Sequence, residues 1–225
     1  MTQSMEDGSV ETRIHGGTLV LLPERAAFWR ENELLLVADP HFGKAATFRA
    51  SGIPVPSGTT GEGLSRLRSA VLRTNARRIA FLGDLLHAEA GRSASMFAAL
   101  AEWRRTNEDV DLLLVRGNHD RRAGDPPADL GIECVDAPHV MQPFVLAHYP
   151  APHPDGYVLA GHVHPGVRLY GGGGLRERLP CFVFGEDYAL LPAFGAFTGL
   201  ADAEPDQNSR VFVIAGDSVV PIDMR

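Results

Sequence analysis

The chain has 225 residues, of which 44% are hydrophobic and 22% charged, and its formal net charge is −7. This length fits one large domain, and the composition argues against wholesale disorder and against coating nucleic acid by bulk charge. The two cysteines, Cys134 and Cys181, are far apart, which argues against a disulfide framework or a cysteine zinc site. We expect a cytoplasmic protein, because residues 1–11 do not resemble a signal peptide and no apolar run approaches the roughly 20 residues of a membrane helix.

Residues 1–16 are expected to form a flexible leader, and residues 17–225 one domain. The first half of that domain alternates between strand and helix patterns. Strands are predicted at 18–22, 26–29, 33–38, 79–82 and 110–115. One predicted helix opens at 59–62, which resembles a capping box, and runs to about residue 75, and a second covers 93–106. The βαβαβ order implies a right-handed parallel sheet.

The pattern changes after Asp120, and residues 121–128 are polar. Short apolar segments separated by turn residues predict strands at 133–135, 144–147, 157–160, 167–170, 180–184, 211–215 and 218–222. Such a series is typical of a mixed or antiparallel sheet. We therefore predict an α/β fold in which a single domain holds two packed sheets with helices outside them.

Five apolar strands end in side chains that can bind a metal or move a proton. The segments are Asp39-x-His41, Gly83-Asp84, Gly117-Asn118-His119-Asp120, Ala147-His148 and Gly161-His162-Val163-His164. Each segment alone could be a turn or a structural histidine. Because ligands bind at the carboxyl ends of strands in α/β sheets, five such ends in one chain predict a shared site.

The ligand types define the chemistry of that site. Carboxylate, amide and imidazole ligands without thiolates suit Mn²⁺, Fe or Zn²⁺. There are more ligands than one ion needs, so we predict two divalent ions bridged by a carboxylate. Two ions about 3.5–4 Å apart can polarise a phosphate and lower the pKa of a bridging water. The expected reaction is in-line attack on phosphorus by a metal-bridging hydroxide.

The ordered set of motifs resembles the calcineurin-like metallophosphoesterase superfamily, over about residues 39–165. The resemblance implies an α/β/β/α sandwich of the metallophosphoesterase type. It also implies site roles: Asp39, His41 and His164 on the first metal, Asn118, His148 and His162 on the second, and Asp84 between them. By the same resemblance, His119 would act as a general acid or as a hydrogen-bond donor to the transition state, and Asp120 would orient it.

Longer strings narrow the resemblance. After Gly83-Asp84 the chain continues Leu-Leu-His87-Ala-Glu, which departs from the Ser/Thr protein phosphatases of the superfamily and leaves the role of His87 open. LVADPHFGKAATFR (36–49), GIPVPSG (52–58) and LPAFGAFTG (191–199) resemble the ligase-associated DNA-damage-response endonuclease family. That likeness implies a Mn²⁺-dependent phosphodiesterase acting on DNA, single-stranded or at strand ends, in a repair set with a DNA ligase and a helicase.

Three cations near the motifs are candidates for substrate binding, namely Lys44, Arg121 and Arg122. Phe42, Phe48 and Tyr149 could stack on bases or simply pack. Two alternatives stay open: a metallophosphoesterase for a nucleotide or other small phosphoester, and a scaffold of the same fold without catalysis. The absence of some of the expected metal ligands would favour the scaffold, and all of these ligands are present in the sequence.

Overall fold

A computed structural model describes residues 2–55, 58–170, 176–196 and 198–223, so parts of the GIPVPSG and LPAFGAFTG strings lie outside the described residues. The first sheet follows the chain in the order β1-β2-β3-β4-β5-β6-β7-β8. Its strands are β1 (Thr2–Ser4), β2 (Val10–Ile14), β3 (Gly17–Leu22), β4 (Ala26–Trp29), β5 (Leu34–Val37), β6 (Arg78–Leu82), β7 (Asp111–Val115) and β8 (Ile132–Val135). Strands β5 to β7 run parallel, as the βαβαβ order predicts. Strand β8, which was expected in the mixed or antiparallel second half, instead pairs parallel with β7 in this sheet.

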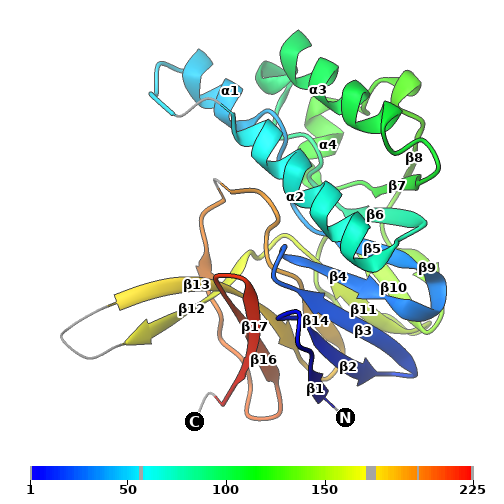
Figure 1. The fold of residues 1–225 in the computed structure, drawn as a ribbon, viewed down its shortest axis with the longest axis vertical. Coiled ribbons are helices and arrows are strands. Elements are labelled where there is room, and N and C mark those ends of the chain that lie inside the picture. Colours follow the sequence, from blue (N-terminus) through cyan, green and yellow to red (C-terminus); the bar gives the residue numbers. More distant parts are fainter. Residues whose placement is uncertain (1, 56–57, 171–175, 197, 224–225) are drawn as a thin grey trace.

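The second sheet is mixed, as expected of the second half of the chain. Its strands are β9 (His139–Met141), β10 (Phe144–Ala147), β11 (Tyr157–Ala160), β12 (Pro165–Tyr170), β13 (Arg176–Phe184), β14 (Tyr188–Leu190), β15 (Ala201–Asp202), β16 (Arg210–Ala215) and β17 (Ser218–Ile222). Strands β10, β11 and β14 are parallel to one another, and most of the others pair antiparallel. The β12–β13 hairpin extends away from the body of the molecule (Figure 1).

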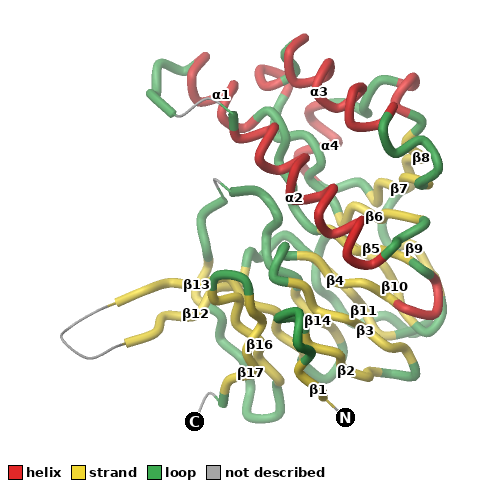
Figure 2. Tube along the Cα trace, viewed as in Figure 1, coloured by secondary structure: helices red, strands yellow, loops and turns green. Residues whose placement is uncertain are grey.

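The helices lie against one face of the first sheet (Figure 2). They are α1 (Lys44–Ala50), α2 (Thr59–Thr74), α3 (Ala94–Arg105) and α4 (Asn118–Ala123), with 3₁₀ turns η1 (Arg30–Asn32), η2 (Glu89–Gly91) and η3 (Ala128–Leu130). The α/β class and the two packed sheets are confirmed. Over the described residues, the expected outer helices cover the first sheet alone, because turns rather than amphipathic segments link the strands of the second.

The apolar run in β5 shows how the layers are held together. Side chains alternate between the faces of a strand, so Leu35 and Val37 pack under the helices while Leu34 and Leu36 face the second sheet. The layer between the sheets joins Leu36 and Leu82 to Phe144 and other side chains of the second sheet. This packing fixes the carboxyl ends of strands from both sheets relative to one another.

Three local predictions need correction. Residues 1–16 were expected to be a flexible leader, but they contain β1 and β2, and Val10 is fully buried between the sheets. Helix α2 begins at Thr59 with Gly58 as its N-cap and no side-chain cap, so the capping box is wrong. No helix was predicted between the strand at 33–38 and residue 59, but helix α1 lies there and follows Gly43, whose φ is 84°. None of the helices in the described part of the chain has both the length and the apolar character needed to cross a membrane.

Candidate metal centre

The five motif segments lie at the ends of β5, β6 and β7 in the first sheet and of β10 and β11 in the second. Two hydrogen bonds join these ends across the sheets. The backbone N–H of His162 donates to Asp39 Oδ2 at 2.8 Å, and His148 Nδ1 donates to the carbonyl oxygen of Leu82 at 3.1 Å. The side chains predicted to share a site are therefore brought together by the packing of the two sheets.

A first group consists of Asp39, His41 and His164, whose ligand atoms lie within 4.8 Å of one another. Asp39 Oδ1, His41 Nε2 and His164 Nε2 are buried, and none of the three has a hydrogen-bond partner among the described residues. The distance from His164 Nε2 to Asp39 Oδ1 is 3.6 Å. Because an unsatisfied buried polar atom costs about 1–3 kcal/mol, three together fit a site built for a cation.

A second group consists of Asn118, His148 and His162. His148 uses Nδ1 to donate to Leu82, so its Nε2 presents a lone pair, as in a metal-binding histidine held by its other nitrogen. That Nε2 lies 3.0 Å from Asn118 Oδ1 and 3.1 Å from His162 Nδ1. Two ring nitrogens and an amide oxygen at such separations fit a second cation.

Asp84 lies between the two groups. Its Oδ1 is 3.5 Å from His148 Nε2, and its Oδ2 is 3.9 Å from His41 Nε2. Burial raises the pKa of the Asp84 carboxyl, because a charge removed from water is destabilised until a cation compensates it. One oxygen facing each group fits the bridging position implied by the resemblance.

The backbone of the centre is conformationally unusual. Asp39, His41, Asp84, His162 and His164 have φ between 48° and 67°, the left-handed region that residues other than glycine seldom adopt. Residues held there cost of order 1–3 kcal/mol each and concentrate at functional sites. Five such residues around one centre indicate that the fold holds these side chains in place at an energetic cost.

Three glycines of the motifs are contact surfaces for the ligands. A Cβ at Gly83 would overlap the His148 ring, one at Gly117 would overlap Asp84 Oδ1, and one at Gly161 would overlap Asp39 Oδ2. Each glycine precedes one candidate ligand in the chain and supports another from a different strand. The sequence pattern indicated turns here, and the contacts explain why the turns need glycine.

His119 reaches the centre through both its backbone and its ring. Its N–H donates to Asp84 Oδ1 at 2.9 Å. Its ring Nδ1 donates to the His87 carbonyl oxygen at 2.5 Å, which leaves Nε2 toward the centre, 3.9 Å from Asp84 Oδ2. This geometry fits a group that exchanges a proton or a hydrogen bond with a phosphate.

The resemblance implied that Asp120 orients the His119 ring, but the Asp120 carboxylate makes its hydrogen bonds elsewhere. Its buried carboxylate accepts hydrogen bonds from the backbone N–H of Gly117 at 2.9 Å and of Leu86 at 3.1 Å. Burial raises the pKa of Asp120, and these two bonds oppose the rise. Asp120 therefore fixes the loop at the start of α4, and the His87 carbonyl fixes the His119 ring.

Of the three predicted substrate cations, Lys44 lies nearest the centre. Burial lowers the pKa of its amine, while Asp39 and Asp84 act in the opposite direction, which places its charge near both carboxylates. Arg121 pairs with Asp136 at 3.0 Å, and Arg122 is exposed on α4. The role of His87 was left open by the sequence. Its Nδ1 lies 3.3 Å from the Nδ1 of His41, and its ring stacks on the His119 ring with the centroids 4.8 Å apart.

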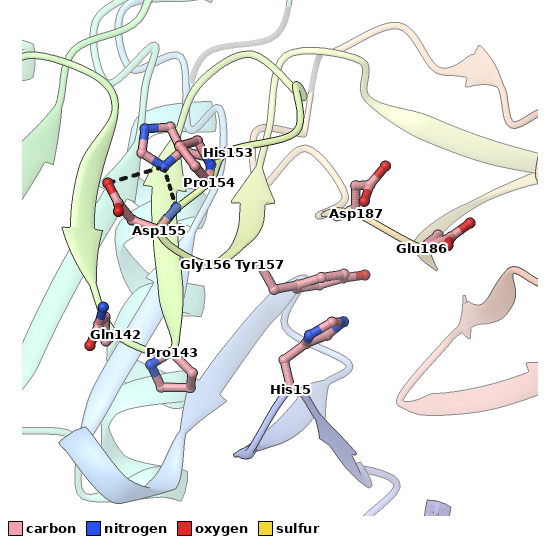
Figure 3. Close-up of a pocket in the computed structure, with 10 residues that line it drawn as sticks. All are labelled: His15, Gln142, Pro143, His153, Pro154, Asp155, Gly156, Tyr157, Glu186 and Asp187. Carbon is pink, nitrogen blue, oxygen red and sulfur yellow. Dashed lines mark hydrogen bonds and ion pairs between the residues drawn. The ribbon is translucent and has the colours of Figure 1, made fainter.

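A cavity of about 630 Å³ lies away from this centre (Figure 3). It is lined by the His15 ring stacked on Tyr157, with His153 and Asp155 on one side and Asp187 on the other. Tyr157 begins β11, whereas His162 follows the end of that strand. The cavity is thus at the opposite end of β11 from the candidate ligands.

The fold and the site together define a metal-dependent phosphoesterase. When bound, divalent metal would supply charge neutralisation at a phosphate and a hydroxide nucleophile at neutral pH. The chain's own residues would add the His119 Nε2 and the Lys44 cation beside them.

Comparison with solved structures specifies the family. A nuclease MPE from Pseudomonas putida matches with a TM-score of 0.83 and 42% sequence identity, over 95% of this chain and 100% of that one. The chain belongs to the family of that nuclease, within the metallophosphoesterase superfamily. YfcE, a phosphoesterase from E. coli, matches at 14% identity with a TM-score of 0.39, over 85% of this chain and 99% of that one. No protein-family model and no curated protein matches the chain.

Proposed function

We propose that the protein is a nuclease that hydrolyses phosphodiester bonds in DNA. The observation that carries this proposal is the 42% identity to a nuclease over that protein's whole length. The complete set of seven candidate ligands supports it further, because a scaffold that has lost catalysis would be expected to lack some of them. DNA is the substrate class that the sequence resemblance also implies.

The proposed reaction uses two divalent ions. Asp39, His41 and His164 would hold one ion, and Asn118, His148 and His162 would hold the other. Asp84 would bind both. The three buried atoms of the first group that lack hydrogen-bond partners support this assignment, as does the position of Asp84 between the groups. Oxygen and imidazole ligands without thiolate would suit Mn²⁺, Fe or Zn²⁺. Mn²⁺ is our first choice, because the resemblance to the ligase-associated endonuclease family implies it. His119 would protonate the leaving oxygen or donate a hydrogen bond to the phosphate.

An activity assay on metal-free protein tests the proposal. Chelated protein resupplied with Mn²⁺, Fe²⁺ or Zn²⁺ is given single-stranded DNA, linear or closed circular, beside bis-p-nitrophenyl phosphate and p-nitrophenyl phosphate. We expect metal-dependent cleavage of DNA and of the diester, with cleavage of the circle identifying an endonuclease. Diester hydrolysis without DNA cleavage would favour a small-phosphoester substrate, and no hydrolysis with bound metal would favour a scaffold.

We propose further that this activity serves DNA repair beside a DNA ligase and a helicase. The support is the likeness of three strings to the ligase-associated endonuclease family. Two residues of the third string lie beside the centre: the N–H of Phe194 donates to the Ala38 carbonyl at 2.8 Å, and that of Gly195 to the Asp39 carbonyl at 3.1 Å. A deletion strain with unchanged sensitivity to DNA damage would argue against the repair role.

A further inference from the structure

Tyr149 is an exposed aromatic side chain at the rim of the metal centre. It follows His148 directly, and 51% of its surface is exposed. Its hydroxyl donates to Asn118 Oδ1 at 3.1 Å, and its ring lies 4.3 Å from the His162 ring and 4.9 Å from the His148 ring. A hydrogen bond and two ring contacts thus hold the ring against candidate ligands while much of it faces solvent.

The other two aromatic candidates near the motifs are placed differently. Phe42 is only 4% exposed and packs in the core under the helices, where Gly63 lies against its ring. Phe48 lies between the Lys44 amine, 6.0 Å from its ring centroid, and the His87 ring at 6.1 Å. Among these three aromatic residues, Tyr149 alone combines a fixed ring, high exposure and contact with ligands.

Charge separates the two sides of the centre. Lys44 lies on the side of His41, with which it shares a small cavity, so a phosphate is attracted there. Pro150 and Val163, which directly follow Tyr149 and His162 in the chain, line a cleft of about 470 Å³ whose lining also includes Glu186, Asp187, Glu204 and Asp206. Those carboxylates would repel a phosphate, whereas an uncharged base on the Tyr149 face would not meet that repulsion.

We propose that Tyr149 is the platform on which a nucleobase next to the scissile phosphate stacks. The inference rests on the proposed nuclease function and adds to it a subsite for the base. Aromatic side chains bind bases of any sequence through their faces, so the contact would position the strand with little base preference. Tyrosine suits the task because its ring is already fixed by the bond to Asn118 and loses little freedom on binding.

The test removes each partner of the stack in turn. End-labelled single-stranded DNA is compared with the same strand carrying one tetrahydrofuran abasic residue, and cleavage at each phosphate is measured for wild type, Tyr149→Ala and Tyr149→Phe. Wild type should cut a phosphate adjoining the abasic residue about 5- to 150-fold less than the same phosphate in the intact strand. Tyr149→Phe, which keeps the ring, should retain this dependence. In Tyr149→Ala the ratio of cleavage in the intact strand to cleavage in the abasic strand should fall to about one.

The outcomes separate this inference from the proposed function. Failure of wild type to cleave the intact strand would contradict the nuclease proposal itself. Cleavage of the intact strand with the same abasic effect in Tyr149→Ala as in wild type would overturn the stacking platform. Tyr170→Ala is the matched control, because Tyr170 is 70% exposed at the outer end of β12 and should leave the ratio unchanged. Bound metal is measured in every variant. If Tyr149→Ala lost metal without a change in the abasic effect, the role of Tyr149 would be to hold Asn118 rather than to stack on a base.

Discussion

Asp39 and His162 come from different sheets and are joined directly, by the 2.8 Å hydrogen bond from the His162 N–H to Asp39 Oδ2. Asp39 is fully buried, and its other oxygen, Oδ1, has no hydrogen-bond partner among the described residues. One carboxylate oxygen thus links the two sheets, while the other is left for a cation. The metal centre therefore depends on the packing of the sheets as much as on the ligands themselves.

Gly161→Ala should weaken metal binding without removing any ligand. The new Cβ would overlap Asp39 Oδ2 and lie 2.9 Å from the Cβ of Ala38, so the carboxylate has to move. Displacing a group that orients a ligand lowers metal affinity by about 10- to 100-fold. Titration of metal-free protein with Mn²⁺ measures the loss. Gly199→Ala is the control, since no heavy atom lies within 4 Å of a Cβ there, and equal affinity in both variants would contradict the contact argument.

Chelation should lower the melting temperature, and Mn²⁺ should restore it. The buried Asp39 and Asp84 repel one another without a cation between them. Metal at about 100 times its dissociation constant adds about 2.7 kcal/mol to the free energy of unfolding, or about 5–10 °C for a chain of this size. Scanning calorimetry with and without Mn²⁺ measures the shift. Asp84→Asn, which can still accept the His119 N–H, should lose most of it, and an undiminished shift would remove Asp84 from the metal site.

His119→Ala should lower turnover far more than it lowers metal content. The bond to Asp84 comes from the His119 backbone and survives the substitution, while the ring Nε2 is lost. Loss of a general acid costs about 10²- to 10⁴-fold in rate. Rates on DNA and on bis-p-nitrophenyl phosphate are compared, because a good leaving group needs little protonation. An equal loss on both substrates would favour hydrogen bonding to the transition state, and parallel loss of metal would contradict either role.

Several features of the centre could be predicted because they are local in sequence. Apolar runs that stop at Asp39, Asp84, Asn118, His148 and His162 mark strand ends, and parallel strands bring such ends together. Other features depend on contacts between distant segments. The support of Asp84 by Gly117 depends on the register of the neighbouring strands β6 and β7. The support of Asp39 by Gly161 depends on the packing of the two sheets. No local pattern contains either.

The misplaced elements have the same cause. In β2 the buried Val10 and Thr12 alternate with Glu11 and Arg13, a pattern too short to distinguish a strand from a flexible leader. The pairing of β2 with β3 makes it part of the first sheet. Helix α4 begins at Asn118, within a motif interpreted only for its chemistry. The role of Asp120 was implied by the resemblance to the superfamily, yet in the fold its carboxylate accepts from the backbone N–H of Leu86 in another loop.

Asp120→Ala should lower the free energy of unfolding by about 1–3 kcal/mol even in metal-free protein. The carboxylate is 1% exposed, and its removal leaves the buried N–H groups of Gly117 and Leu86 without acceptors. Urea unfolding in EDTA measures the change. Asp129→Ala is the control, because Asp129 is exposed in η3. If Asp120→Ala lost activity but no stability, Asp120 would belong to the chemistry rather than to the loop.

His87 should make the stability of the metal-free protein depend on pH. Burial, with Lys44 and His119 adding to it, lowers the pKa of His87 to about 4 from its ordinary 6.5. Below pH 6.5 the unfolded chain takes up a proton that the folded chain refuses until about pH 4, so stability is lost as the pH falls through that range. His87→Gln carries no such proton. The difference in unfolding free energy between His87→Gln and wild type should therefore grow in favour of the variant from pH 7 to pH 5. Urea unfolding in EDTA at pH 7, 6 and 5 measures it, and the unrelated shifts of Asp84 and Asp120 cancel in the comparison. A difference that does not change with pH would mean that His87 is as readily protonated in the folded protein as in the unfolded chain.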